Sequence, residues 1–185
     1  TYMDQLKLSG YYTRKGDLNE FAKLSITALR YPVLWETYQP HKYTKVDFGE
    51  LATDLCKLKQ HNIEPIAGLL HHGSGPEFTD LLDENFPLLF AEYAAEVASA
   101  FPYLKYYTPV NEPLTTARFS GLYGHWYPHH KNEISFLKIL FNQLKGTVLA
   151  MQEIRKVNPD AKLIQTEDLA KVFSTQQMKY QADFE

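Results

Sequence analysis

The hydrophobic pattern along the chain alternates between two periods. Short apolar runs are typical of buried strands, and they occur at residues 26–35 (ITALRYPVLW), 63–70 (IEPIAGLL), 104–110 and 161–166. Apolar residues at helical spacing predict helices at 17–22, 47–62, 86–101 and 133–157, and allow a further one at 175–185. The segment 114–131, rich in Gly, Tyr, His and Pro, is interpreted as a loop.

This order of elements predicts a fold. Helices and strands that alternate regularly are typical of a parallel sheet covered by helices, so we expect an α/β chain with about four parallel strands. The length of 185 residues fits a single domain over 1–185. No GxGxxG or GxxxxGK[ST] follows a strand, which counts against nucleotide-binding folds, and we expect no cofactor.

Composition narrows the function classes. With 19 Lys and Arg against 22 Asp and Glu, the net charge is −3, whereas a nucleic-acid surface should be basic. No apolar run approaches the roughly 20 residues of a membrane helix. One cysteine, Cys56, excludes an internal disulfide and favours a reducing compartment, so we expect a cytoplasmic protein. The chain has 26 aromatic residues in 13 Tyr, 11 Phe and 2 Trp, a supply that suits sugar ligands as well as core packing.

Polar residues stand at the carboxyl ends of all four predicted strands. The first strand carries Arg30 and is followed by Glu36, and the second ends in the pair 71–72 (HH). The third ends in 111–112 (NE), and the fourth reaches Glu167. Any one of these residues could be a packing histidine or a capping carboxylate. Because parallel strands bring their carboxyl ends to one face, which carries the active site in barrels of this class, we expect the four sets to converge in one cleft.

Three segments resemble motifs of family 1 glycoside hydrolases, and they occur in the family's order. Residues 108–113 (TPVNEP) resemble the fourth-strand motif T-x-N-E-P. Residues 29–36 (LRYPVLWE) resemble the second-strand segment R-x-S-x-x-W, and 63–72 (IEPIAGLLHH) resemble the third-strand segment I-x-P-x-x-x-L-x-H-W. The match extends from about Asp17 to Glu167. It implies a (β/α)8, or TIM-type, barrel of which this chain holds about half.

The departures from the family pattern are specific. Pro32 replaces the second-strand Ser, and His72 replaces the Trp that follows the third-strand His, which suggests a divergent bacterial branch. The four strands correspond to the family's second to fifth. The family's nucleophile, a glutamate on the seventh strand, has no counterpart here.

The resemblance implies roles for individual residues. Glu112 would be the general acid/base of a hydrolase cleaving small β-linked glycosides, like a β-glucosidase or β-galactosidase. Asn111 would hydrogen-bond the sugar 2-hydroxyl, an interaction that strengthens in the transition state. Arg30 would set the charge of the site floor. Substrate contacts are also expected from His71, His72 and Trp126, with the Trp126 ring stacking on a sugar.

The second carboxylate is the open question, because retaining glycosidases place two carboxyl groups about 5–5.5 Å apart. We expect Glu167 in this role, with Glu36 as a further candidate. Four strands are half of eight, so two copies could close one barrel, and we expect a homodimer or higher homo-oligomer.

Two alternatives come from other classes of protein. The first is a noncatalytic sugar-binding module, or a truncated fragment of a larger family-1-like protein that lacks the nucleophile. The second is a metal enzyme using His71, His72, His125, His129 and His130. No carboxylate-rich ligand pattern accompanies these histidines, and Pro128 interrupts the last three, so we expect no metal.

Overall fold

The computed structural model describes residues 5–14, 16–44, 46–171 and 173–183. Its sheet consists of four strands, all paired in parallel, in the order β1-β2-β3-β4. They are β1 (Ala28–Pro32), β2 (Glu64–His71), β3 (Tyr106–Asn111) and β4 (Lys162–Leu163). The predicted α/β class with four parallel strands is confirmed. In this register His71 lies opposite Asn111, so the ends of β2 and β3 are level with each other.

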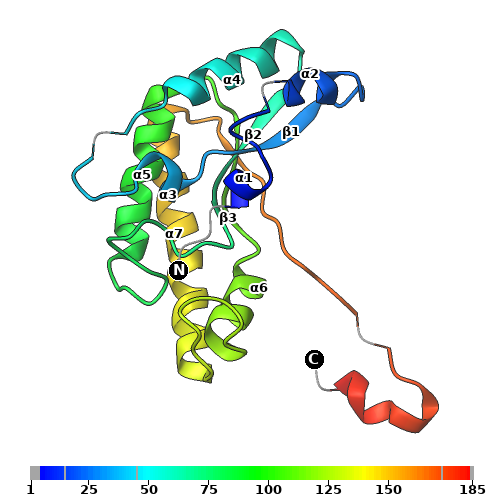
Figure 1. Ribbon diagram of the computed structural model, residues 1–185. Helices are drawn as coiled ribbons and strands as arrows, with labels where there is room; N and C mark the ends of the chain where they lie inside the picture. Colours follow the sequence, from blue (N-terminus) through cyan, green and yellow to red (C-terminus); the bar gives the residue numbers. More distant parts are fainter. Residues whose placement is uncertain (1–4, 15, 45, 172, 184–185) are drawn as a thin grey trace.

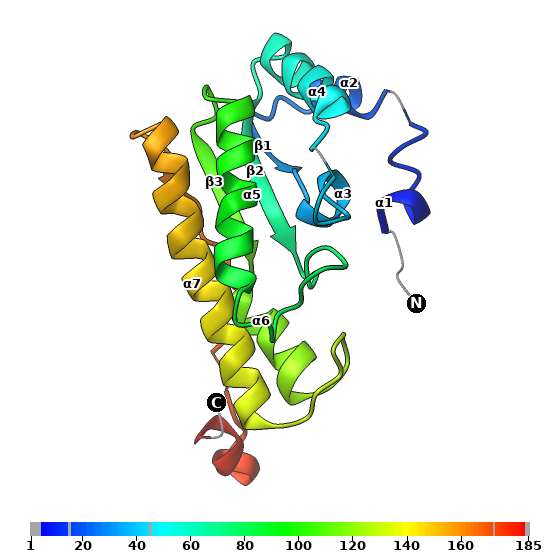
Figure 2. The ribbon, with the colours of Figure 1, turned by 90° about the vertical axis from the view of Figure 1, so that its left-hand side faces the viewer.

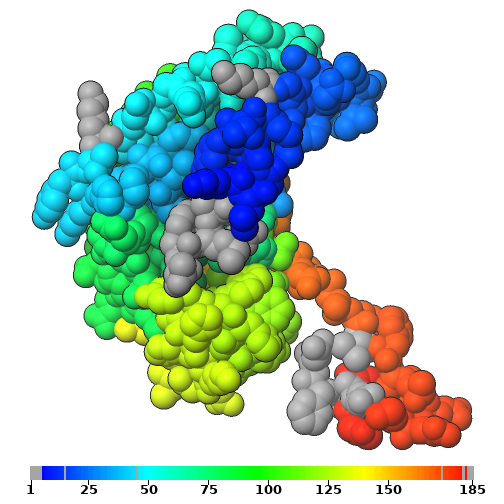
Figure 3. Space-filling model, viewed as in Figure 1, coloured from blue at the N-terminus to red at the C-terminus, as the bar shows by residue number. Residues whose placement is uncertain are grey.

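Helices alternate with these strands (Figure 1). The α-helices are α1 (Gln5–Leu8), α2 (Asp17–Ala22), α3 (Trp35–Tyr38), α4 (Gly49–Gln60), α5 (Phe86–Ala100), α6 (Pro113–Ala117) and α7 (Glu133–Val157). A π-helical turn spans Arg118–Leu122, and a 3-10 helix spans Gln176–Asp183. The segment that carries this 3-10 helix stands apart from the rest of the molecule (Figure 3). None of the helices in the described ranges is long and apolar enough to cross a membrane.

The two long helices α5 and α7 lie side by side over one face of the sheet (Figure 2). They approach closely at Gly146 of α7, where an added Cβ would lie 3.3 Å from Cδ1 of Phe90. Three buried aromatic side chains of α5 pack around the buried indole of Trp35: Phe86, Phe90 and Tyr93. On β1, Tyr31 is buried while its neighbour Arg30 is exposed, as expected when successive strand residues point to opposite faces.

The first and fourth strands are shorter than their apolar runs predict. Strand β1 ends at Pro32, which has no N–H for a ladder, and Trp35 starts α3 instead. The indole Nε1–H of Trp35 donates to Oε1 of Gln39 at 2.8 Å and closes that helical turn. After β4 the ladder is interrupted, and a single bridge then joins Asn111 to Thr166.

The interpretation of 114–131 as a loop is wrong in its first half, which forms α6 and the π-helical turn. Pro113 occupies the first helical position, where its missing N–H costs nothing. Gln143 of α7, completely buried, donates from Nε2 to the carbonyl of Pro113 at 3.0 Å. A buried side chain of the long helix therefore fixes the start of α6.

Candidate active site

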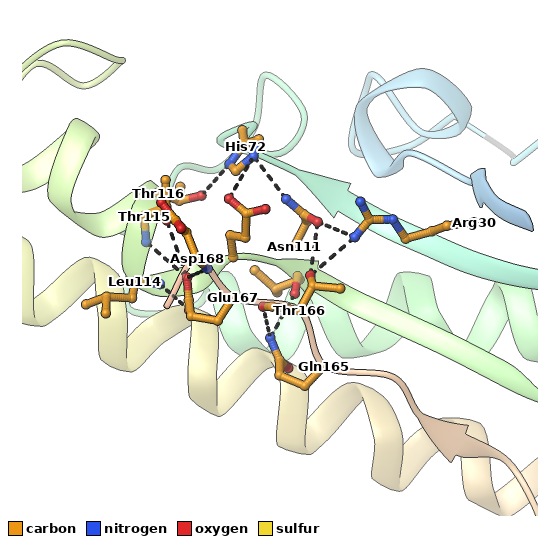
Figure 4. A network of polar contacts seen from close by, with 12 residues as sticks. Arg30, His72, Asn111, Leu114, Thr115, Thr116, Gln165, Thr166, Glu167 and Asp168 are labelled. Atoms are coloured by element: carbon orange, nitrogen blue, oxygen red, sulfur yellow. Dashed lines mark hydrogen bonds and ion pairs between the residues drawn. The ribbon is translucent and has the colours of Figure 1, made fainter. Parts of the chain in front are cut away.

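Asn111 is a buried polar residue at the carboxyl edge of the sheet, with 2% of its surface exposed. Its Oδ1 accepts hydrogen bonds from Nη1 of Arg30 and, at 3.0 Å, from Oγ1 of Thr166 (Figure 4). Arg30 Nη1 also lies 3.2 Å from Thr166 Oγ1. Side chains from the middle of β1, from the end of β3 and from the segment after β4 therefore meet at one amide oxygen.

His72 lies between the amide of Asn111 and the carboxylate of Glu112, the next residue in the chain. The His72 Nε2 lies 3.0 Å from Nδ2 of Asn111 and 3.6 Å from Oε2 of Glu112, while its Nδ1 lies 3.0 Å from Oγ1 of Thr116. The carboxylate of Glu112 is 29% exposed, so it reaches solvent from a partly enclosed position. Burial is the largest effect on the imidazole and lowers the pKa of His72, with Glu112 opposing the shift.

Both His72 and Glu112 adopt left-handed backbone conformations, with φ of 55° and 45°. A non-glycine residue in this region stores about 1–3 kcal/mol of strain and persists only where surrounding contacts hold it. Here the contacts are those of the imidazole on one side and of α6, which starts directly after Glu112, on the other. Strain of this kind concentrates at functional sites.

Two further predicted residues lie against His72. The ring of His71 meets the His72 ring edge-on at a centroid distance of 4.7 Å, and the indole of Trp126 lies 4.9 Å away. Trp126 is in turn packed edge-on against Phe119 of the π-helical turn. Burial lowers the pKa of His71, and the charges of His72 and Arg30 add to the effect.

The carboxylate of Glu167 lies at the amino end of α6 (Figure 4). Its Oε2 accepts from the backbone N–H of Leu114 at 2.9 Å, and its Oε1 accepts from the backbone N–H groups of Thr115 at 3.4 Å and Asp168 at 3.2 Å. The N–H groups of Leu114 and Thr115 are among the free N–H groups that every helix exposes at its start, and a negative charge there is favourable. Glu167 thus holds in place the helix that follows Glu112, and its predicted catalytic role stays a prediction.

The predicted residues Arg30, His71, His72, Asn111, Glu112, Trp126 and Glu167 therefore gather at one edge of the sheet. Glu36 lies beside the loop after β2, since a Cβ on Gly73 would be 3.0 Å from its Oε1. Two further side chains of the cluster, Thr116 and Thr166, were not expected as site residues from the sequence. Thr166 directly precedes Glu167 in the polar strand end, whereas Thr116 lies in the segment interpreted as a loop.

The histidines considered as metal ligands, all within the described residues, do not form a metal site. In the described ranges no group of three or more His, Cys, Asp or Glu side chains could hold a metal ion. His129 instead bonds the carbonyl of Gly124 through Nδ1, and His130 bonds Oγ of Ser135.

A surface hollow lies at the opposite, amino-terminal ends of β3 and β4, lined by Tyr103, Lys105, Tyr106, Asn158, Asp160 and Lys162. In β/α barrels that end serves stability rather than chemistry.

A family model described as glycosyl hydrolase family 1 matches residues 4–181. The chain belongs to glycosyl hydrolase family 1. The motifs that resembled this family at 29–36, 63–72 and 108–113 thus contain five of the clustered residues: Arg30, His71, His72, Asn111 and Glu112. None of the curated proteins compared with this family 1 chain matches it significantly.

Solved structures agree with this membership at the level of fold. A beta-glucosidase from Thermotoga maritima in complex with castanospermine superposes with a TM-score of 0.82 at 19% identity, over 94% of this chain and 41% of its own. A beta-glycosidase from Pyrococcus horikoshii gives 0.81 at 19% identity, over 94% and 42%. The T. maritima enzyme with glucoimidazole gives 0.74 at 21% identity, over 83% and 37%.

The family 1 chain therefore spans about two fifths of the length of the solved structures that it matches. Together with the four parallel strands, this coverage confirms the expected partial (β/α) barrel.

Proposed function

We propose that this chain carries the acid/base half of a glycoside hydrolase site for small β-linked glycosides, with Glu112 as the general acid/base. The observation that carries the proposal is the placement of Glu112. Its carboxylate stands at the carboxyl edge of a parallel sheet, next to the buried Asn111 and 3.6 Å from the imidazole of His72. That edge is where β/α-barrel enzymes hold their catalytic groups. The titles of the solved relatives, such as a beta-glucosidase in complex with deoxynojirimycin, support a sugar-like ligand.

The side chains around Glu112 are the proposed sugar contacts. Arg30, Asn111, His71 and His72 supply hydrogen-bonding groups, and Trp126 supplies an aromatic face beside them. Sugar sites commonly combine such polar groups with aromatic rings, because one face of a pyranose is apolar and its edge carries hydroxyl groups. In this arrangement Glu112 protonates the glycosidic oxygen as the bond breaks and deprotonates the incoming water afterwards.

The second carboxyl group is proposed to come from outside the immediate surroundings of Glu112. Glu167 was predicted for this role, but both of its oxygens accept hydrogen bonds from backbone N–H groups in the first turn of α6, and one of them also accepts from the N–H of Asp168. A nucleophile with its lone pairs engaged in this way would have to break those hydrogen bonds to attack. Positioning of α6 is therefore the role that the contacts of Glu167 support.

A second copy of the chain is one source for the missing half of the site. Within the described ranges the sheet has two edge strands, β1 and β4, and unpaired edges favour association. Helix α7 also exposes apolar side chains at alternating three- and four-residue spacing: Ile134, Leu137, Phe141, Leu144 and Val148. We therefore keep the homodimer as a proposal, and the cytoplasmic location stays a prediction.

The alternative is a noncatalytic sugar-binding module, or one segment of a longer protein whose other part holds the nucleophile. The observation that favours it is that the chain covers only 36–42% of the matched structures. In that case the clustered residues bind a sugar without cleaving it.

One experiment separates these functions. The wild type and Glu112→Gln are compared on p-nitrophenyl β-glycosides and in calorimetric binding of deoxynojirimycin, using a gel-filtration peak whose mass is measured by light scattering. A hydrolase should lose about 10²–10⁴-fold in kcat upon substitution while it keeps its ligand, since the amide cannot transfer a proton. Equal binding with no hydrolysis by either protein supports the noncatalytic alternative. Active wild type that keeps its rate as Glu112→Gln refutes the role of Glu112, and an active species of 21.4 kDa refutes the homodimer.

A further inference from the structure

His72 stands where the resembled family carries tryptophan, so its role at this site does not follow from the family pattern. Its nitrogens face Asn111, Glu112 and Thr116, and its ring packs against His71 and Trp126. A tautomer for this imidazole follows from the groups that surround it.

The first step concerns the amide of Asn111. Its Oδ1 receives the guanidinium of Arg30 and the hydroxyl of Thr166. Because a guanidinium has only donors, the atom facing it must be the amide oxygen and not the amide nitrogen. The Nδ2 group, a donor, is therefore the one that lies 3.0 Å from Nε2 of His72.

The second step concerns the imidazole. An N–H group of Asn111 that points at Nε2 requires a lone pair there, so Nε2 carries no proton. The remaining proton of a neutral imidazole is then on Nδ1, which lies 3.0 Å from Oγ1 of Thr116 and donates to it. An imidazolium would place N–H against N–H at Asn111 and lose that hydrogen bond.

The charges around His72 agree with a neutral ring. Burial is the largest effect and disfavours the imidazolium, as does Arg30 on β1, and His71 on β2 is a further basic neighbour in ring contact. Glu112, before α6, and Glu167, after β4, act in the opposite direction. The net effect is a lowered pKa for His72.

We propose that Asn111 and Thr116 lock His72 as the neutral Nδ1–H tautomer, and that His72 is a positioning residue that keeps Glu112 free of a cationic partner. This inference rests on the proposed function for its catalytic meaning. At 3.6 Å from Nε2, a protonated His72 would form an ion pair with the Glu112 carboxylate and favour the ionised form, which is not a general acid. A neutral Nε2 whose lone pair is already taken by Asn111 leaves the Glu112 proton available for the leaving group.

The test is a direct observation of the imidazole nitrogens by two-bond 1H–15N correlation in 15N-labelled protein near neutral pH, with His72→Gln used to assign the signals. We expect a protonated Nδ1 and an unprotonated Nε2. The conservative variant Thr116→Val removes the acceptor of Nδ1–H and should shift the population toward Nε2–H about five-fold, which corresponds to one ordinary hydrogen bond. Thr115→Val, a threonine that bonds Glu167 and not His72, is the matched control and should leave the tautomer unchanged.

Wild-type His72 observed as Nε2–H or as imidazolium would overturn the proposal, and so would an unchanged tautomer in folded Thr116→Val. If the tautomer is as expected but no glycoside is hydrolysed, the lock stands and the hydrolase assignment fails. If hydrolysis is observed, Thr116→Val should lower kcat more than it changes KM and should move the pH profile of kcat. A merely structural role would lower the folded fraction and leave that profile in place, which would also refute the proposal.

Discussion

Replacing Glu167 with alanine separates a structural carboxylate from a catalytic one. The substitution removes the acceptor of the 2.9 Å hydrogen bond from the Leu114 N–H, the weaker contacts of Thr115 and Asp168, and a negative charge at the amino end of α6. Only one of these hydrogen bonds is short and made to the helix itself, so the loss should resemble that of a helix N-cap. We expect the free energy of unfolding to fall by about 1–2 kcal/mol.

Urea unfolding monitored by circular dichroism measures this loss. With a typical slope near 2 kcal/mol per molar urea for a protein of this size, the midpoint should fall by about 0.5–1 M. Glu167→Gln keeps the length and one acceptor oxygen, so it should lose less than the alanine variant. The matched control is Asp168→Ala, which removes the same charge from an exposed neighbour whose backbone N–H, rather than its carboxylate, makes the contact. It should leave the midpoint nearly unchanged.

A Glu167→Ala protein that is as stable as wild type, yet has lost hydrolysis, would refute the positioning role. The carboxylate would then act on substrate, as first predicted from the strand end. A stable and fully active variant would contradict both roles, because it would mean that neither α6 nor the reaction needs this side chain.

Two further predictions concern packing and pH. Gly121→Ala should lower stability by about 1–3 kcal/mol, because its Cβ would lie 2.7 Å from the backbone N and Cα of Phe136, and neither can move without shifting α7. Gly16→Ala, with nothing within 4 Å of its Cβ, should stay within about 0.5 kcal/mol of wild type, and equal midpoints for the two variants would contradict the close contact. The pKa values of His71 and His72 are lowered from 6.5 by folding, so the unfolded chain binds protons more readily. Stability should therefore be retained above that value and decline as the pH falls through it, and urea midpoints that stay flat between about pH 8 and about pH 5 would argue against buried, neutral histidines.

The long elements could be predicted from the sequence because their signals are local. Helix α7 spans residues 133–157, the range that its apolar spacing predicts. Asn132 caps the helix by accepting a hydrogen bond from the Ser135 N–H at 2.9 Å. The gathering of the strand ends could be predicted too. Parallel strands all run in the same direction, so polar residues that follow them lie at the same edge of the sheet. Both predictions depend on patterns that lie within about 25 consecutive residues or fewer.

Helix α6 could not be predicted in this way, since what holds it is distant in sequence. The Gln143 amide that bonds Pro113 lies 30 residues further along the chain, and the Glu167 carboxylate that bonds Leu114 lies 53 residues beyond its partner. A five-residue helix is too short to be stable alone, so its sequence carries little signal. Thr116 was missed as a result, although it is the acceptor on which the tautomer of His72 depends.

The contacts that position Glu112 all come from within the four-stranded unit. Gln143 of α7 donates a hydrogen bond to the carbonyl of Pro113, the residue that follows Glu112. The Glu112 carboxylate faces His72, which directly follows β2. None of these contacts requires a strand beyond β1 to β4 among the described residues. A unit that folds with this network intact should therefore present Glu112 in the same position whether the opposite carboxylate comes from a second copy or from a further part of a longer chain. The acid/base geometry and the source of the nucleophile are thus independent questions.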